Sequence, residues 1–205
     1  MIYKNSTICG NDFNEGGANY TLVGSSVQVS DDGIASNFTT TSYIQLPTIY
    51  TNGKDFEINL GKIKSPSNNA RSIIVGASRG HGFGIGFYNY TIYVTSFSER
   101  FATYYTSALT ANTDYYIKGG VSGSNAYVSY SLNGTDWTTK TAALTNTYTQ
   151  LNEFIGVYDG QYPPSYSIDL KQITFSVDGK VAYAFATNKA SISSYQITAN
   201  EFYEI

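Results

Sequence analysis

The sequence predicts an all-β protein folded as a two-sheet antiparallel sandwich. Short segments that alternate apolar and polar residues recur about every 8 to 12 residues, which is the strand spacing of such sandwiches. Between them fall pairs such as Asp178-Gly179 and Asn133-Gly134, which favour the positive φ angles of tight hairpin turns. No window of about 11 residues shows the apolar stripe and caps of a helix.

Alternation identifies the individual strands. It predicts strands over 27–29, 43–46, 56–60, 83–88, 91–95, 115–118 and 126–132. The run 72–76 is apolar throughout, so this strand is expected to be buried on both faces. Pro47 and Pro66 end two of the segments because proline lacks the donor that a ladder needs. Asn89-Tyr90 is expected to turn one strand into the next.

The last strands change phase within the segment 168–177. Apolar residues alternate with polar ones over 173–177, whereas Ile168 and Leu170 belong to the opposite phase. Both sets face the core only if an extra residue bulges out near Lys171-Gln172. Asp178-Gly179 then supplies a hairpin turn.

Length and composition suit one sandwich domain. The chain has 205 residues, of which 20 are Tyr and 19 Gly, and only 13% are charged. Tyr and Thr fit a pleated surface, and Gly and Asn fit turns. We expect the sandwich at 23–185, an N-terminal arm or edge segment at 1–22, and a C-terminal docking tail at 186–205.

The tail is too apolar to be a plain solvated end. Its apolar residues include Tyr195, Ile197 and Phe202, and we expect them to dock either on the same sandwich or on a neighbouring subunit. The second arrangement, which we prefer, would make the protein a homo-oligomer or part of a larger shell.

Charge and cysteine content exclude several partners. The net charge is −3 with a pI near 5.0, and basic residues form no cluster, so nucleic acid is not an expected partner. No run of about 18 apolar residues occurs, which argues against membrane insertion. The first residues lack the apolar stretch of a signal peptide, so we expect cytoplasmic synthesis without one. Cys9 is the single cysteine and provides neither a disulfide nor a Cys-based metal site.

An ordered set of segments carries a resemblance to a known family. The segments are 33–38, 43–47, 56–58, 113–118, 130–137, 155–158 and 168–170. In this order they resemble the strands of laminin-G-like, concanavalin-A-like jelly-roll domains, especially those of bacteriophage tail, fibre and baseplate proteins. The resemblance spans roughly residues 25 to 185. It implies a jelly-roll sandwich used for attachment or glycan contact.

The sequence does not predict an enzyme. A retaining glycosidase needs two carboxylates about 5 Å apart, and Glu57 has no acidic partner two or four residues after it. Polysaccharide lyases of the same fold have a strand that 115–120 resembles, but they also need an Arg-bearing strand and a Gln-X-His segment. The sole histidine, His81, lies between glycines without that glutamine.

A metal or other cofactor is not expected either. Asp31-Asp32-Gly33 and Asp159-Gly160 offer carboxylates of the kind that calcium accepts. Asp-Gly pairs most often form turns, so we expect turns at both segments. A structural calcium at one of them is the alternative. The alternating glycines over 80–86 leave one face of a strand bare, which favours close packing over ligand contact.

Tyrosines supply the candidate binding surface. Alternation places one set on the outer face of its strands, and the loops add three more aromatic residues. The candidate glycan-binding residues are Tyr88, Tyr93, Tyr116, Lys118, Tyr127, Trp137, Tyr158 and Tyr162. Sugars stack on such rings and bond to nearby hydroxyls, whereas outward tyrosines also line subunit contacts. Trp137 either covers the end of the sandwich or forms an exposed platform.

These observations predict a non-enzymatic virion surface or tail-associated module that attaches to the host through cell-surface glycans. The alternative is a structural decoration or fibre protein that contacts only other virion proteins. A polysaccharide-degrading enzyme is the more distant alternative. In the first two cases the protein is located in the virion.

Overall fold

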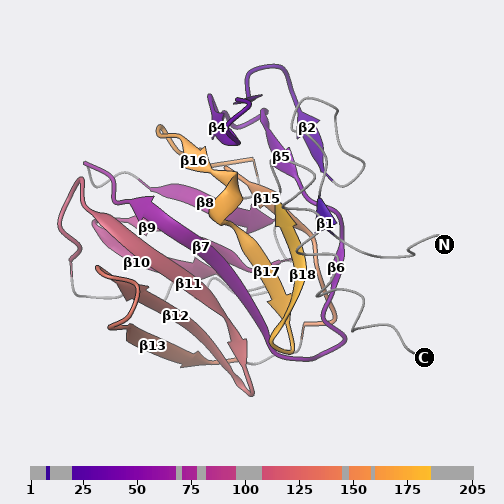
Figure 1. Cartoon of the computed structure of the whole chain (residues 1–205), viewed down its shortest axis with the longest axis vertical. Helices are drawn as coiled ribbons and strands as arrows, with labels where there is room; N and C mark the ends of the chain where they lie inside the picture. The colour runs from indigo at the N-terminus through magenta and orange to yellow at the C-terminus, as the bar shows by residue number, and fades with distance from the viewer. Residues whose placement is uncertain are drawn as a thin grey trace.

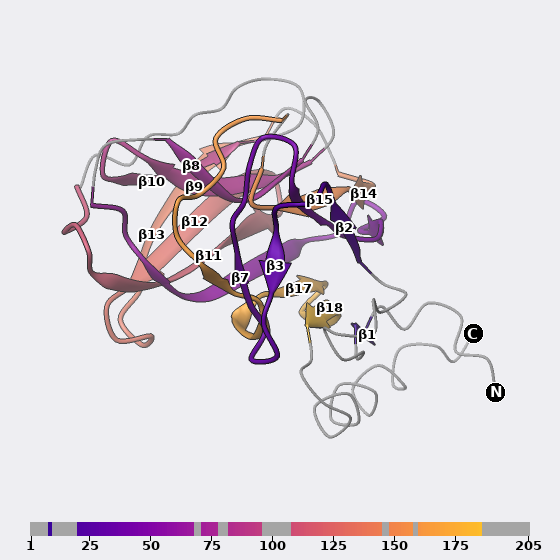
Figure 2. The same ribbon diagram turned by 90° about the horizontal axis from the view of Figure 1, so that it is seen from above.

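Two stacked β-sheets form most of the computed structural model, which describes residues 8–9, 20–67, 71–77, 82–95, 108–144, 148–157 and 160–185. For residues 8–9 only the backbone is described. Figure 2 shows the layers from above, with β8, β9 and β10 on one side and β7, β17 and β18 on the other. The protein is therefore an all-β, two-sheet antiparallel sandwich, as the strand pattern predicts.

The larger sheet has seven strands that lie side by side in Figure 1. Their order is β1 (Ile8–Cys9), β18 (Lys180–Phe185), β17 (Thr174–Val177), β7 (Phe56–Lys64), β11 (Asp114–Ser122), β12 (Asn125–Ser131) and β13 (Thr138–Ala143). All neighbours are antiparallel except β1, which runs parallel to β18. Residues 8–9 thus add an edge strand to the sheet.

The second sheet has six strands. Their order is β10 (Thr91–Thr95), β9 (Gly84–Tyr88), β8 (Ser72–Ala77), β15 (Glu153–Ile155), β5 (Tyr43–Gln45) and β2 (Thr21–Val23). Two small sheets flank the sandwich. They pair β14 (Gln150–Leu151) with β6 (Ile49–Tyr50), and β4 (Ile34–Ser36) with both β3 (Gln28–Val29) and β16 (Ile168–Asp169). Every residue of β8 is buried, in agreement with the apolar run in its sequence.

The core lies between the two large sheets. Alternate residues of β7 and β11, such as Ile58 and Ile117, are fully buried and point into it. An edge-to-face contact joins the sheets, because the ring of Phe56 in β7 lies 5.4 Å from that of Phe83, which precedes β9. Burial of these apolar side chains holds the two layers together.

The phase change in the last strands is absorbed by a helical turn instead of a bulge. A 3₁₀ turn over Leu170–Gln172 separates β16 from β17, and both Leu170 and Ile173 are buried. Gln172 packs onto a bulge in β7, where Gly61 has a φ of +64° and the pairing with β11 shifts register. The Gln172 side chain accepts a hydrogen bond from the Lys62 amide at 2.6 Å.

Two of the three predicted hairpin turns have the expected geometry. Asn89-Tyr90 has φ angles of 49° and 60°, and Asp178-Gly179 has φ angles of 53° and 75°. The hairpin predicted at Asn133-Gly134 does form, because β12 pairs antiparallel with β13, but the segment 132–137 connects the two strands as a longer loop than a two-residue turn. Asn133 Oδ1 accepts hydrogen bonds from the amides of Thr135 and Asp136, both at 2.9 Å, which fixes this loop.

Several predictions concern residues that the structure does not describe. His81, Tyr158, Asp159 and the tail 186–205 lie outside the described residues. The Asp31-Asp32-Gly33 segment is the turn between β3 and β4, where the Gly33 amide donates to Ser30 O at 2.8 Å. Within the described residues, His, Cys, Asp and Glu do not gather in groups of three or more. These residues also contain no helix with the length and apolar character needed to cross a membrane.

Candidate functional site

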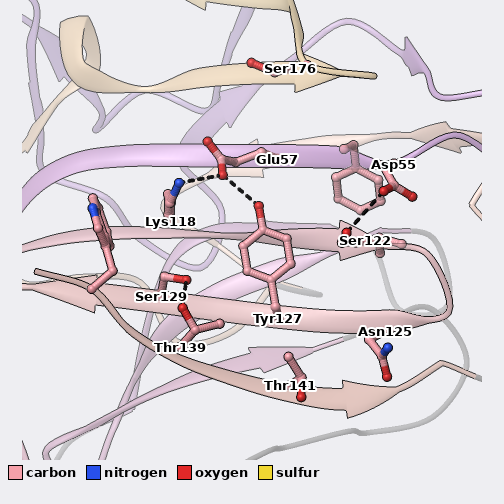
Figure 3. A pocket seen from close by; sticks show the side chains of 14 residues that line it. Asp55, Glu57, Lys118, Ser122, Asn125, Tyr127, Ser129, Thr139, Thr141 and Ser176 are labelled. Carbon is pink, nitrogen blue, oxygen red and sulfur yellow. Dashed lines mark hydrogen bonds and ion pairs between the residues drawn. The ribbon is translucent and has the colours of Figure 1, made fainter. Parts of the chain in front are cut away.

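A pocket of about 700 Å³ lies on the outer face of the seven-stranded sheet (Figure 3). It crosses the sheet from the β17–β18 hairpin to β13 and is called the sheet pocket below. The polar lining consists of Asp55, Glu57, Lys118, Ser122, Asn125, Tyr127, Ser129, Thr139, Thr141 and Ser176. Phe56, Val121, Trp137 and Gly179 complete it. Its volume is within the range of small-ligand sites.

Alternation along three strands determines which side chains face the pocket. In β7 Phe56 and Ile58 point into the core, so Glu57 between them points outward. By the same rule Lys118 faces outward beside buried Ile117 in β11. In β12 Tyr127 and Ser129 flank buried Val128 and also face the pocket.

Glu57 connects the three strands at the centre of the pocket. Its Oε2 atom accepts a hydrogen bond from the Tyr127 hydroxyl at 2.7 Å and forms an ion pair with Lys118 Nζ at 3.0 Å. Figure 3 shows both contacts at one carboxylate oxygen, with the other oxygen directed away from them. Lys118 and Glu57 retain 30% and 33% of their side-chain exposure, so both remain accessible to a ligand.

Tyr127 is held as a hydrogen-bond donor. Burial raises the pKa of its phenol well above its usual value, and the hydrogen bond to Glu57 and the charges of Glu57 and Asp55 raise it further. The phenol therefore stays protonated at physiological pH. It donates its proton to Glu57 instead of serving as a base.

Trp137 and Lys118 form one end of the pocket. The Lys118 ammonium lies 5.0 Å from the centre of the Trp137 ring, a cation–π distance. Trp137 is 37% exposed although it is large and apolar. The ring therefore borders the pocket and is partly open to solvent.

Asp55 occupies the opposite end. Its Oδ1 atom accepts from the Gly123 amide at 2.8 Å and its Oδ2 atom accepts from the Ser122 hydroxyl at 3.2 Å. These bonds tie the start of β7 to the β11–β12 turn. The carboxylate is therefore used in positioning the turn, although it also borders the pocket.

Hydroxyl groups line the side of the pocket nearest β13. Ser129 and Thr139 pair across β12 and β13, with 2.7 Å between their oxygen atoms, and Thr141 follows on the same face of β13. Hydroxyls both donate and accept hydrogen bonds. This wall can therefore bind polar, uncharged ligand groups.

The structure separates the predicted binding residues into two groups. Lys118, Tyr127 and Trp137 come together in the sheet pocket. Tyr116 faces the same side of the sheet but packs beside Gly134 instead of lining the pocket. Tyr88 is 39% exposed but belongs to β9 in the other sheet, so it cannot share this surface.

The prediction that Tyr93 is exposed is wrong. Tyr93 is only 1% exposed, and every residue of its strand β10 is buried. The Arg71 guanidinium covers its ring at 4.8 Å and donates through Nε to its hydroxyl at 3.0 Å. Tyr162, another predicted site residue, stacks on the same guanidinium at 4.4 Å. Tyr162 thus belongs to a cluster that covers the six-stranded sheet.

Sequence reasoning missed Asp55 as a pocket residue and gave Glu57 no role. An acidic partner was expected after Glu57 in the sequence, whereas Asp55 precedes it by two positions. Residues two apart in an extended segment share a face. The Asp-X-Glu spacing at 55–57 is therefore the signal that would have found this pair.

Comparisons with known proteins support the fold. No protein-family model matches the sequence, and no curated protein does. Among solved structures, the Ca²⁺-bound VIP36 exoplasmic/lumenal domain is similar with 12% identity and a TM-score of 0.51, covering 85% of this chain and 96% of that one.

Two further similar structures have lower scores. The alginate lyase AlgAT5 from Polysaccharide Lyase family 7 has 13% identity and a TM-score of 0.43, covering 77% of this chain and 94% of its own. The receptor binding domain of botulinum neurotoxin C/D mosaic serotype has 11% identity and a TM-score of 0.49, and the match covers 92% of this chain and 48% of that chain. At 12% identity the likeness to the Ca²⁺-bound VIP36 domain shows the fold alone. The chain is a jelly-roll, concanavalin-A-like β-sandwich.

Proposed function

We propose that the protein binds carbohydrate through the sheet pocket without cleaving it. The observation that carries this proposal is the exposed Trp137 ring beside a floor of hydroxyl, carboxylate and ammonium groups. Sugars present apolar C–H faces that stack on aromatic rings and hydroxyls that bond to polar side chains. Both kinds of contact are available within this one pocket.

The engagement of both pocket carboxylates supports a binding role over catalysis. Glu57 is held by Lys118 and Tyr127, and Asp55 is held by the Ser122 hydroxyl and the Gly123 amide. A general acid or base must be available to the reacting group. The Tyr127 hydroxyl donates its proton to Glu57, so it is directed at this carboxylate and not at a ligand.

We place the protein on a bacteriophage particle, where the pocket contacts a glycan of the host surface. The resemblance of the ordered segments between residues 25 and 185 to phage structural proteins supports this location. Assembly with other virion proteins through a different surface is compatible with the same pocket.

Replacing Trp137 with alanine should weaken glycan binding by about tenfold or more, because an exposed aromatic anchor often dominates the affinity of such a site. A glycan array identifies a ligand for the wild-type protein, and calorimetry then measures both affinities. Tyr88→Ala is the matched control, since Tyr88 is similarly exposed on the other sheet. Equal losses of affinity in the two variants would show that the glycan does not bind in the sheet pocket.

We expect no depolymerisation of bacterial surface polysaccharides by the wild-type protein, because both pocket carboxylates already have hydrogen-bond or ion-pair partners within the protein. The measurement follows new reducing ends and unsaturated sugar products over long incubations. Activity that disappears in both Glu57→Gln and Asp55→Asn would show instead that the two carboxylates act as a catalytic pair.

A further inference from the structure

The sheet pocket holds few charges, and they contact one another. Three of its 14 lining residues are charged, namely Asp55, Glu57 and Lys118. With two carboxylates and one ammonium, the formal charge of the lining is −1. A ligand that enters the pocket therefore meets a slight excess of negative charge.

Lys118, the cation of this lining, already has two partners. Its Nζ atom lies 3.0 Å from Glu57 Oε2 and 5.0 Å from the centre of the Trp137 ring. An anionic ligand would have to compete with Glu57 for the ammonium. If it succeeded, the displaced Glu57 carboxylate would remain beside it and repel it.

Two further lysines, Lys54 and Lys62, are also paired. Lys54 contacts Asp178 at 3.2 Å near the Gly179 end of the pocket, and Lys62 contacts Asp114 at 3.4 Å on the other side of Lys118. Each of these ammonium groups has a carboxylate next to it. None of the three pairs presents an uncompensated positive charge to a ligand.

The uncharged part of the lining favours hydroxyl-rich ligands. Thr139 and Thr141 offer exposed hydroxyls along β13, Ser129 holds Thr139 in place from β12, and Asn125 adds an amide. These groups form hydrogen bonds with sugar hydroxyls, which carry no charge. Trp137 adds a stacking surface that does not depend on ligand charge.

The pocket also crosses several strands. Its lining extends from Ser176 in β17 through β7, β11 and β12 to Thr141 in β13. Neighbouring strands lie about 4.8 Å apart, so this path is about 19 Å long and accommodates several linked sugar units. The ligand that fits such a length is a segment of a polysaccharide chain.

From these contacts we infer that the sheet pocket selects uncharged polysaccharide chains and discriminates against polyuronates. This inference rests on the proposed carbohydrate-binding function and specifies its ligand class. A polyuronate repeats one carboxylate per sugar, so every unit in the pocket would meet the pocket's own carboxylates. An uncharged chain carries a hydroxymethyl group in place of each of these carboxylates, so it avoids this repulsion.

Matched oligosaccharide pairs test the inference. The pairs are β-1,4-linked mannan and mannuronan, and β-1,4-linked glucan and glucuronan, whose members differ only in the oxidation of one carbon. We expect at least one uncharged member to bind the full-length protein about tenfold more tightly than its uronate partner. Its affinity should change little between low and high salt.

Charge variants identify the groups responsible. Glu57→Gln removes the carboxylate that holds Lys118, so the preference of the pocket for the uncharged chain should fall at least fivefold and uronate binding should become salt-sensitive. Asp114→Asn is the control, because it removes the same charge from the same sheet but outside the pocket. The preference of the Asp114→Asn variant for the uncharged chain should equal that of the wild-type protein.

Each result has a separate meaning. Tighter binding of a uronate member by the wild-type protein, or an equal shift in Asp114→Asn, would overturn the inferred ligand class and leave the proposed function standing. Binding confined to other acidic glycans on an array would also overturn it. Absence of binding to any glycan would refute the proposed function, and the inference with it.

Discussion

Replacing Glu153 with glutamine is expected to stabilise the fold above about pH 5 and to remove a large part of its pH dependence. Glu153 in β15 is fully buried. Its Oε1 atom accepts a hydrogen bond from the Phe83 amide at 2.8 Å, whereas Oε2 has no hydrogen-bond partner within the described residues. Burial raises the pKa of this carboxyl well above its usual value, and the bond from Phe83 offsets only part of the effect.

The sign of the effect follows from the two pKa values. Below the unfolded-state pKa of Glu153, near 4.5, the group is protonated in both states and causes no penalty. As the pH rises further, the unfolded state ionises while the folded state keeps its proton. The free energy of unfolding then falls by about 1.4 kcal/mol per pH unit until the folded-state pKa is reached. Glutamine cannot ionise, so its contribution stays constant.

Urea unfolding at pH 4.5, 6 and 8 measures this difference for the wild-type protein and Glu153→Gln. Glu153→Met is the matched control, since it also removes the ionisation but leaves the Phe83 amide without its acceptor. It should show the same pH profile as glutamine, lowered at every pH by about 1 to 3 kcal/mol. Parallel pH profiles for Glu153→Gln and the wild type would contradict the prediction.

Local pattern was sufficient for the strands and for the direction of most side chains. Alternation over 56–60 and 126–128 predicts which residues are buried, because a strand with one dry face repeats every two residues. It fails beyond Val128, where Ser129 and Ser131 are buried and Leu132 is exposed. The Asp178-Gly179 turn was predictable because its two positive φ angles depend mainly on the two residues themselves.

Pairing between distant strands was not predictable in the same way. Tyr88 and Tyr127 have similar local patterns, yet their strands belong to different sheets. Tyr93 points outward as its strand predicts, but Arg71 and Tyr162 cover it, and nothing near Tyr93 in the sequence indicates them. The fate of an outward residue depends on what the rest of the chain places over it.

The centre of the sheet pocket depends on register. Gly120 of β11 pairs with Glu57 of β7 on one side and with Tyr127 of β12 on the other. The hydrogen bond from Tyr127 to Glu57 therefore passes over Gly120, which has no side chain. Each of the three residues can be assigned to a strand from sequence, whereas their alignment is set by the turns and by the bulge at Gly61.

Replacing Gly120 with alanine is expected to cost about 3 kcal/mol of stability, because the new methyl group has no space. A Cβ atom at this position would lie 1.9 Å from Phe56 O and 2.9 Å from Glu57 Cα, both part of the β7 backbone. Backbone atoms in the middle of a sheet cannot move aside as a flexible side chain can. The two strands must therefore separate, which also pulls Glu57 away from Tyr127.

Gly123→Ala provides the control for this variant. Gly123 has a φ of +58° and open space around its Cβ position, so alanine there costs only the left-handed backbone conformation, about 1 to 2 kcal/mol. Chemical unfolding should therefore rank Gly120→Ala as clearly less stable than Gly123→Ala. Gly120→Ala should also lose glycan affinity under conditions where it remains folded, because the contact between Tyr127 and Glu57 is broken. Equal stabilities for the two variants would mean that β7 and β11 adapt to the methyl group. The close approach of the two strands would then not explain why glycine occupies position 120.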